Sequence, residues 1–242
     1  MDIAMNVKAL SLKEDPLADK VRVSMQVIKK ALDTYGRDGL ALSFNGGKDC
    51  TVLLHLFSAV LRDRDNNEPN VHINGATNSI KKDKSEADHR IRCLYVSNHE
   101  VFPEVDAFVA ECTDKYNLDL VAIHMPMKEA LEEYMKIRKD VGAFLIGTRR
   151  GDPHGKYLDH FTPSDHGWPK LMRVSPILDW TYEDIWQFIR AVGIPYCGLY
   201  DKGYTSLGNI STTTPNPALL KNGEYVPAYH LKDEELERHG RK

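Results

Sequence analysis

The sequence has no long apolar run, no marked excess of charge of one sign and no closely spaced cysteine pair. No apolar stretch approaches the roughly 20 residues of a membrane helix, so we expect no contact with a membrane. Residues 1–13 lack a basic segment followed by an apolar one, so we predict no secretory signal. With 32 Lys and Arg against 35 Asp and Glu, the net charge of -3 does not favour nucleic acid as the main partner.

The cysteines and histidines indicate no metal or disulfide framework. Three of the four cysteines sit in apolar patterns, so we expect buried, reduced thiols and a cytoplasmic or similarly reducing compartment. Three histidines, His154, His160 and His166, share one loop without the close spacing of metal ligands, so we expect solvated side chains rather than a zinc site. The cysteines are Cys50, Cys93, Cys112 and Cys197.

The apolar pattern predicts strands that alternate with helices. Helices are expected at residues 18–36, 49–61, 105–116, 127–139 and 181–191, and strands at residues 40–44, 91–96, 119–124 and 143–147. This alternation favours an α/β fold with a doubly wound, mainly parallel sheet flanked by helices. Ligands bind such sheets at the carboxyl ends of the strands. We therefore expect a site formed by residues 45–47, 97–99, 125–126 and 148–150.

We predict a single domain over residues 1–242, with a nucleotide-binding core at residues 18–150 and a C-terminal extension at residues 151–242. Residues 62–89 have almost no core residues and predict a flexible, solvated insertion. Residues 148–176 are polar and rich in turns, and a loop of that length is usually functional or disordered. The aromatic and Arg residues in it argue against disorder.

Residues 43–49, Ser-Phe-Asn-Gly-Gly-Lys-Asp, stand between a predicted strand and a predicted helix. Two consecutive glycines let backbone N–H groups approach an anion, and the helix N-terminus also favours one. The segment is not a Walker A loop, since Leu42 stands where Gly is needed and an Asp follows the Lys. A plain Gly-Gly turn capped by Asp49 is the alternative. The candidate ligands are Ser43, Gly46, Gly47, Lys48 and Asp49.

The segment resembles the phosphate loop of the PP-loop ATP pyrophosphatases, which cleave ATP between its α- and β-phosphates. Its Phe-Asn-Gly-Gly-Lys-Asp form is similar to the branch with phosphoadenylyl sulfate reductase and eukaryotic FAD synthase. Residues 147–153, Gly-Thr-Arg-Arg-Gly-Asp-Pro, and residues 162–173 resemble the FAD synthase signatures, and the similarity covers essentially residues 18–242 except the insertion. The reductases carry a nucleophilic cysteine near the C-terminus. None lies beyond Cys197 here, so thiol chemistry is disfavoured. Some animal FAD synthases carry an N-terminal molybdopterin-binding-like domain, for which this chain has no room, so we expect the single-domain, fungal-type form.

The resemblance implies a PP-loop, adenine nucleotide alpha hydrolase-like fold and transfer of the adenylyl group of ATP to FMN, giving FAD and pyrophosphate. Mg²⁺ is the expected cofactor. The FMN phosphate, with a second pKa of about 6, is largely a dianion at neutral pH, so no general base is required. The expected catalytic residues are Asn45, Lys48, Asp49 and Arg173, with Asp49 also a metal ligand.

The resemblance also implies a set of binding residues, with adenine near Val96 and Met125 and the flavin in the stretch that ends at Arg173. Trp168 could instead be a structural loop aromatic, and Asp152 could anchor its loop. The full set is Ser43, Gly46, Gly47, Val96, Met125, Gly147, Arg149, Arg150, Asp152, Asp165, Trp168, Met172, Arg238 and Arg241.

Two pairs of arginines have alternative roles. Arg149 and Arg150 could be solvated charges at a strand end. Arg238 and Arg241 are predicted at i, i+3 on a helix, where they could close over the FMN phosphate or solvate a terminal helix.

Two other functions stay open from the sequence. Another PP-loop pyrophosphatase would need a nucleophilic cysteine or an ammonia-supplying domain, and neither is evident. A catalytically silent flavin- or nucleotide-binding module is the second alternative. We expect ATP and FMN as small-molecule partners and a monomer or weak homo-oligomer. FAD retained after purification would make the protein yellow.

Overall fold

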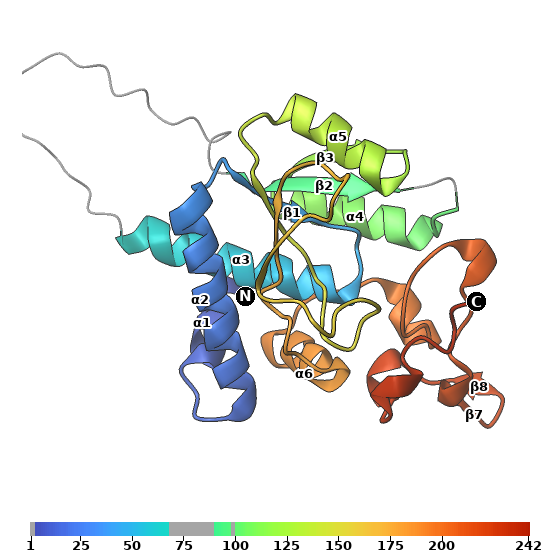
Figure 1. Cartoon of the computed structure of the whole chain (residues 1–242). Coiled ribbons are helices and arrows are strands. Elements are labelled where there is room, and N and C mark those ends of the chain that lie inside the picture. The colour runs from blue at the N-terminus through green and yellow to red at the C-terminus, as the bar shows by residue number, and fades with distance from the viewer. Residues whose placement is uncertain (1–2, 68–89, 98–99) are drawn as a thin grey trace, which may run out of the picture.

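The computed structural model describes residues 3–67, 90–97 and 100–242. Within these residues the main sheet has six strands in the order β3-β2-β1-β4-β6-β5 (Figure 1). Every neighbouring pair is parallel except β5 and β6. This order confirms the predicted doubly wound, mainly parallel sheet. The strands are β1 (Leu40–Ser43), β2 (Arg92–Val96), β3 (Asp119–Ile123), β4 (Ala143–Leu145), β5 (Phe161–Pro163) and β6 (Met172–Val174).

Local capping signals mark where two of the helices begin. Asp15 Oδ1 accepts a hydrogen bond from Ala18 N at 2.8 Å, and a proline occupies the first turn of α2. The predicted capping box of α6 is confirmed, because Thr181 N donates to Asp184 Oδ2 at 2.7 Å and Asp184 N donates to Thr181 Oγ1 at 3.2 Å. The helices are α1 (Ile3–Ser11), α2 (Pro16–Tyr35), α3 (Lys48–Asn67), α4 (Pro103–Lys115), α5 (Met127–Ile137) and α6 (Tyr182–Val192).

Both faces of the central strand β1 are buried. Leu40 and Leu42 pack into the larger apolar cluster, to which α1, α2, α3, α4 and α6 contribute. Ala41 points the other way, into a smaller cluster with Phe144 of β4 and Tyr134 of α5. Figure 1 accordingly shows α5 on one side of the sheet and α3 and α6 on the other. A continuous apolar run such as β1 is typical of a strand covered on both faces.

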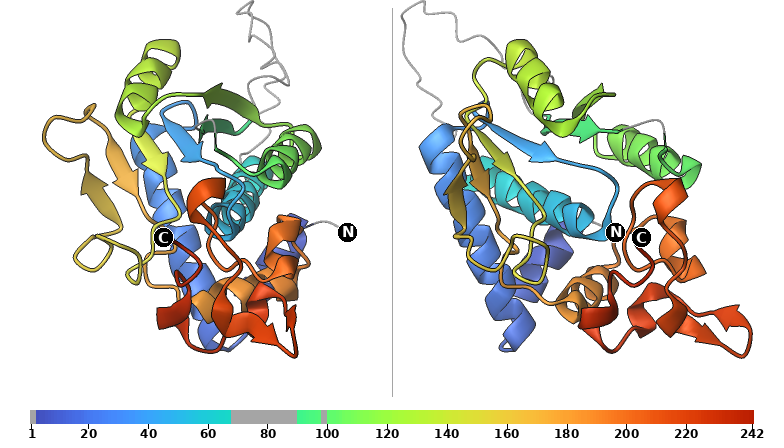
Figure 2. Two further views of the ribbon diagram at one scale, coloured as in Figure 1. Left: turned by 90° about the vertical axis from the view of Figure 1, so that its right-hand side faces the viewer. Right: turned by 45° about the vertical axis from the view of Figure 1, so that its right-hand side comes forward.

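The chain after α6 consists of short 3-10 helices and a small hairpin, β7 (Leu220–Lys221) with β8 (Glu224–Tyr225). Figure 2 shows this segment, coloured orange to red, returning to lie beside the carboxyl end of β1 and the start of α3. Strand β6 belongs to the predicted C-terminal extension but pairs with β4 in the main sheet, Leu145 opposite Val174. The proposed division at residue 150 stays a prediction.

The structure differs from the expected elements in three places. The helix α1 was not predicted. Residues 62–67 of the predicted insertion are the last turns of α3, where Asp63 Oδ1 pairs with Lys8 Nζ of α1 at 2.5 Å; residues 68–89 lie outside the described residues. The predicted loop at 148–176 contains β5 and β6, because pairing with β4 stabilises a run too short to be recognised alone. No helix in the described ranges has the length and apolar character to cross a membrane.

His55 on α3 is a buried titratable residue on the side of the sheet opposite α5. Its side chain is 2% exposed, and its ring packs edge-on against Tyr116 with 4.9 Å between the centroids. Burial, helped by the charge of Lys115, lowers the pKa of His55 from 6.5 to about 4. The folded protein therefore holds this imidazole in its neutral form.

This burial predicts a loss of stability in acid. Between pH 6.5 and about 4 the unfolded chain binds a proton at His55 that the folded chain does not. The free energy of unfolding should therefore fall as the pH is lowered through this window, by up to roughly 3 kcal/mol. Urea unfolding of His55→Gln at pH 7 and pH 4.5 should show a smaller fall than the wild type. His166→Gln, at an exposed position, is the control. An equal fall in wild type and His55→Gln would contradict this interpretation.

Candidate active site at the carboxyl ends of the strands

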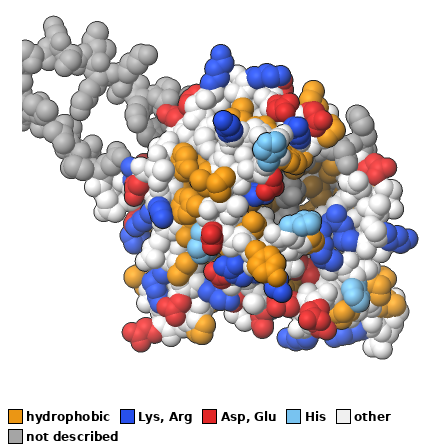
Figure 3. All heavy atoms as spheres, viewed as in Figure 1, with side chains coloured by type: hydrophobic (Ala, Val, Ile, Leu, Met, Phe, Trp, Pro, Cys, Tyr) orange, Lys and Arg blue, Asp and Glu red, His pale blue; other side chains and the backbone are white. Residues whose placement is uncertain are grey.

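A cavity of about 1160 Å³ opens where the carboxyl ends of the parallel strands meet. Asn45 follows β1, Ser97 follows β2, Met125 follows β3 and Thr148 follows β4, and all four line it. This is the edge at which the topology predicts a ligand. In Figure 3 this face is hollowed right of centre, with hydrophobic, His and basic side chains around the hollow. Asn98 and His99 of the predicted edge lie outside the described residues.

The backbone of the loop at residues 43–49 makes a tight turn. Gly46 has a φ of +72°, and a Cβ there would lie 3.0 Å from Val109 of α4. Gly46 is therefore buried behind the loop and does not line the cavity, whereas Ser43 and Gly47 do. Gly47 N donates to Asn45 Oδ1 at 3.0 Å. The turn needs glycine at residue 46 for both its conformation and its packing.

Side chains hold the loop from behind. The thiol of Cys50 donates to Asn45 Oδ1 at 2.9 Å, and burial raises the pKa of this thiol to about 12. Cys50 is thus a protonated donor rather than a nucleophile. Lys48 N donates to the hydroxyl of Tyr200 at 2.9 Å. Because the oxygen of Asn45 is used within the loop, its amide nitrogen is the atom left to donate toward the cavity.

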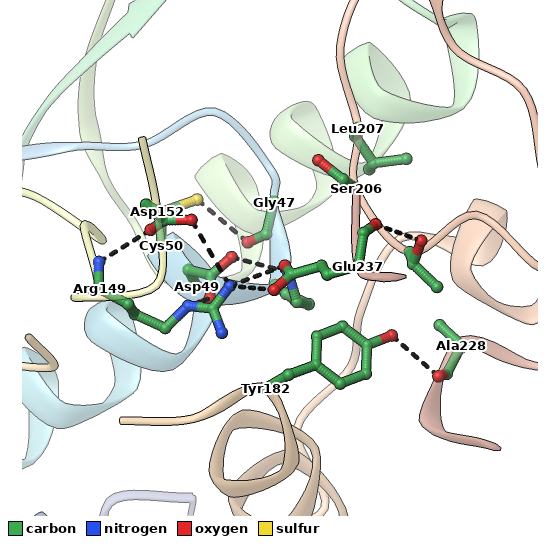
Figure 4. A network of polar contacts seen from close by, with 12 residues as sticks. Gly47, Asp49, Cys50, Arg149, Asp152, Tyr182, Ser206, Leu207, Ala228 and Glu237 are labelled. Carbon is green, nitrogen blue, oxygen red and sulfur yellow. Dashed lines mark hydrogen bonds and ion pairs between the residues drawn. The ribbon is translucent and has the colours of Figure 1, made fainter. Parts of the chain in front are cut away.

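Five charged groups gather at the base of the loop, in what we call the charge cluster: Lys48, Asp49, Arg149, Asp152 and Glu237 (Figure 4). The two cations are almost fully buried, Lys48 at 2% and Arg149 at 4% exposed. Lys48 Nζ lies 3.0 Å from Asp49 Oδ2 and 2.5 Å from Glu237 Oε1. The cluster therefore joins the loop at residues 43–49, the turn after β4 and the C-terminal tail.

Arg149 is the centre of the charge cluster. Its Nη2 donates to both carboxylate oxygens of Glu237, at 2.7 and 2.6 Å, and its Nε lies 2.9 Å from Asp49 Oδ1. Its own backbone N donates to Asp152 Oδ2 at 2.8 Å, so Asp152 anchors the turn. Next to it, Gly147 lets the end of β4 approach α3, since a Cβ there would lie 3.2 Å from Asp49 Cβ.

The charge cluster shifts the pKa values of its members in opposite directions. Burial alone would raise the pKa of Asp49, but the charges of Lys48 and Arg149 outweigh it and hold that pKa below its ordinary value. The pKa of Asp152 is raised, because burial exceeds the effect of Arg149. For Arg149, the surrounding carboxylates overcome burial and raise the pKa further. Asp49 is therefore ionised at neutral pH.

The segment between β5 and β6, together with β6 itself, supplies another part of the cavity wall. Trp168 is 40% exposed and lines the cavity, as do Asp165 and Arg173. The guanidinium of Arg173 donates to both carboxylate oxygens of Asp165, at 3.2 Å each, and to Pro163 O at 3.1 Å. This bidentate pairing fixes Asp165 and Arg173, both predicted site residues, relative to each other.

The C-terminal arginines reach the cavity, but not from a helix. Residues 237–240 form turns and Arg241 makes an isolated bridge with Thr213, so the predicted helical face is wrong. Arg241 Nη1 donates to Leu207 O at 2.5 Å, and its guanidinium lies where a Cβ of Gly208 would be, 2.2 Å from Cζ. Arg238 Nη1 lies 3.8 Å from Asp152 Oδ1. Contacts with distant segments, rather than local helix formation, place both side chains.

Three other predicted binding residues do not line the cavity: Arg149, Arg150 and Met172. Arg149 is buried within the charge cluster, 4% exposed. Arg150 pairs with Asp179 and donates to Leu158 O at 3.0 Å, so it stabilises its own loop. Met172 packs against the larger apolar cluster, because alternate residues of β6 point to opposite faces and Arg173 takes the cavity side. Val96 and Met125 line the cavity as expected.

The sequence analysis did not predict three features of the site. Glu237 lines the cavity from a polar tail that offers no periodic pattern. Tyr200 holds the loop from a segment more than 150 residues away. Ser97 and His124 pair across neighbouring strand ends, with 2.6 Å between Oγ and Nδ1. Only the last had a usable signal, since Ser97 follows one predicted strand and His124 ends another.

Comparison with known proteins gives one consistent result. Residues 39–215 match the model of the phosphoadenosine phosphosulfate reductase domain family. A probable FAD synthase of Schizosaccharomyces pombe is 44% identical over 227 residues, which are 93% of this chain and 80% of the relative. A probable FAD synthase of Caenorhabditis elegans is 36% identical over 90% of this chain, and the chain spans 40% of that relative's length.

The fold is also that of a solved structure. Candida glabrata FMN adenylyltransferase in complex with FMN and the ATP analogue AMPCPP has a TM-score of 0.83 and 23% identity to this chain. The match covers 99% of this chain and 97% of that one.

The charge cluster predicts that replacing Arg149 lowers the free energy of unfolding much more than replacing the adjacent Arg150. Arg149→Ala should lower the free energy of unfolding by about 3–5 kcal/mol, because it leaves buried carboxylates without their partner. Arg150→Ala removes an exposed ion pair and should cost less than about 1 kcal/mol. Urea unfolding of the two variants measures both values. Similar losses in the two would show that Arg149 does not hold the site together.

Proposed function

The chain belongs to the FAD synthase family, and on that premise we propose that it transfers the adenylyl group of ATP to FMN, giving FAD and pyrophosphate. The observation that carries the proposal is the single cavity lined both by the loop at residues 43–49 and by Trp168, Asp165 and Arg173. Because these two sets of residues line the same cavity, it can hold two nucleotides with their phosphates adjacent, as adenylyl transfer requires.

The loop supports binding of the ATP triphosphate. Ser43, Asn45 and Gly47 line the cavity next to the start of α3, where a hydroxyl, a side-chain amide and the N-terminus of a helix together favour an anion. Lys48 is the adjacent cation, although Glu237 and Asp49 contact it in this structure. Adenine would lie across the ends of β2 and β3, against Val96 and Met125.

The residues present fit a Mg²⁺ ion bound with the phosphates. Asp49 is ionised, and its Oδ1 accepts no hydrogen bond among the described residues, although Arg149 Nε lies 2.9 Å from it. The same part of the chain holds no group of three or more His, Cys, Asp or Glu side chains that could bind a metal alone. Mg²⁺ commonly takes one or two carboxylates and completes its shell with phosphates and water, so Asp49 would hold it. Bound there, it would neutralise charge on the phosphate oxygens.

The part of the cavity lined by Trp168, Asp165 and Arg173 supports binding of FMN. Trp168 offers a planar ring for the isoalloxazine, and Asp165 offers a carboxylate to a ring N–H or to the ribityl hydroxyls. Arg173, Arg238 and Arg241 supply positive charge for the FMN phosphate. Their guanidinium groups would bring that phosphate close to the α-phosphorus of ATP.

The reaction follows from bringing two polyanions together. An oxygen of the FMN phosphate dianion attacks the α-phosphorus, a new P–O bond forms, and the bond to the β-phosphate oxygen breaks in line so that pyrophosphate leaves. No proton has to be removed from the nucleophile. The protein contributes orientation and charge stabilisation, from backbone N–H groups, Asn45 and the arginines.

The four described cysteines are buried and free, which fits a reducing compartment. We therefore propose a cytoplasmic protein, and we propose that it is a monomer or a weak homo-oligomer.

The test is to incubate the purified protein with FMN, ATP and Mg²⁺ and to separate the products. FAD and pyrophosphate should form in equal amounts. Asp49→Asn should lower turnover on the order of a hundredfold, because it removes the charge that holds Mg²⁺ without changing the side chain's size. Asp179→Asn, which lies outside the cavity, is the control. Full activity of Asp49→Asn would remove Asp49 from the site, and absence of FAD with the wild type would refute the function.

The proposed flavin site makes a separate prediction about affinity. Trp168→Ala should weaken FMN binding roughly tenfold through loss of ring stacking. Tyr157→Ala is the matched control, because Tyr157 is an aromatic residue between β4 and β5, 87% exposed and outside the cavity wall. Titration of FMN, followed by quenching of its fluorescence, gives both dissociation constants. An unchanged constant for Trp168→Ala would exclude the stacking role.

A further inference from the structure

The carboxylate of Glu237 contacts both buried cations of the charge cluster. Its Oε1 accepts from Lys48 Nζ at 2.5 Å and from Arg149 Nη2 at 2.7 Å, while its Oε2 accepts from the same Nη2 at 2.6 Å. A carboxylate and a phosphate group offer such cations the same kind of anionic acceptor. Figure 4 shows Glu237 entering the charge cluster from the tail, opposite Asp49.

Glu237 gives the charge cluster an excess of negative charge. With Glu237 the charge cluster holds three carboxylates against two cations, and without it two against two. Lys48 is 2% exposed and its ammonium group is paired with both Asp49 and Glu237, so a phosphate that contacts it has to displace a carboxylate. The Glu237 carboxylate keeps the two buried cations paired while no phosphate is bound.

The carboxylate of Glu237 is not what holds the tail in place. Thr205 Oγ1 donates to the backbone carbonyl of Glu237 at 2.6 Å, and Asn216 Nδ2 donates to that of Leu236 at 2.7 Å. Thr214 N donates to Gly240 O at 2.8 Å. These bonds do not involve the side chain of Glu237, so a change of its charge should leave the tail in position.

We infer that Glu237 is a positioning residue that stands in for a phosphate group on Lys48 and Arg149. It gives way to the β- and γ-phosphates when ATP binds and competes with pyrophosphate after transfer, so it promotes release of that product. The inference rests on the proposed function, since it concerns the same phosphate site.

Calorimetric titration with inorganic pyrophosphate and Mg²⁺ tests the inference directly. Glu237→Gln keeps the size of the side chain and removes its charge, so its dissociation constant for pyrophosphate should fall on the order of tenfold. Glu235→Gln is the matched control, because Glu235 is an exposed carboxylate of the same tail outside the cavity wall. Unchanged or weaker binding by Glu237→Gln would overturn the inference.

Two further measurements separate the possible failures. FAD formation by the wild type is assayed in parallel, so that FAD formation together with unchanged pyrophosphate affinity of Glu237→Gln refutes this inference alone. If Glu237→Gln does not fold, a crystal structure of the wild type with Mg²⁺ and pyrophosphate decides. The Glu237 carboxylate should then lie beyond 4 Å from Lys48 Nζ, and a carboxylate still hydrogen-bonded to it would overturn the inference.

Discussion

The site depends on pairing two buried cations with three carboxylates. Lys48 and Arg149 could not be buried alone, because an unpaired charge in the interior costs several kcal/mol. Their partners come from three segments far apart in the sequence: the start of α3, the turn after β4 and the C-terminal tail. The charge cluster therefore joins these three segments at the site, while hydrogen bonds to the backbone of the tail, such as Thr205 Oγ1 to Glu237 O at 2.6 Å, keep Arg238 and Arg241 at the cavity.

The topology of the sheet forms most of the remaining site. A parallel sheet brings the ends of β1, β2, β3 and β4 to one edge, and the loop between β1 and α3 places backbone N–H groups there. The proposed reaction joins two polyanions and needs no base. The groups required are positive charge, N–H donors and a flat apolar surface, and Trp168 and the arginines provide them in one cavity.

Local patterns predicted the first four strands, the helices α2 to α6 and the capping box at Thr181, because each depends on periodicity or on neighbouring residues. The elements that were missed depend on distant partners. Strand β6 exists because it pairs with β4, and Glu237 joins the site because Arg149 is there to receive it. For the same reason the sequence could not show that Arg150 turns to Asp179 while Arg149 turns inward, although the two are adjacent.

The most direct test of the account follows the α-phosphorus of ATP. The purified protein is given FMN, Mg²⁺ and ATP labelled with ³²P either at the α- or at the γ-phosphate, and the labelled products are separated. Transfer between the two substrates in one cavity predicts that the α-label appears in FAD and the γ-label in pyrophosphate. Label from the γ-position in inorganic phosphate, or α-label in AMP or ADP with none in FAD, would contradict it.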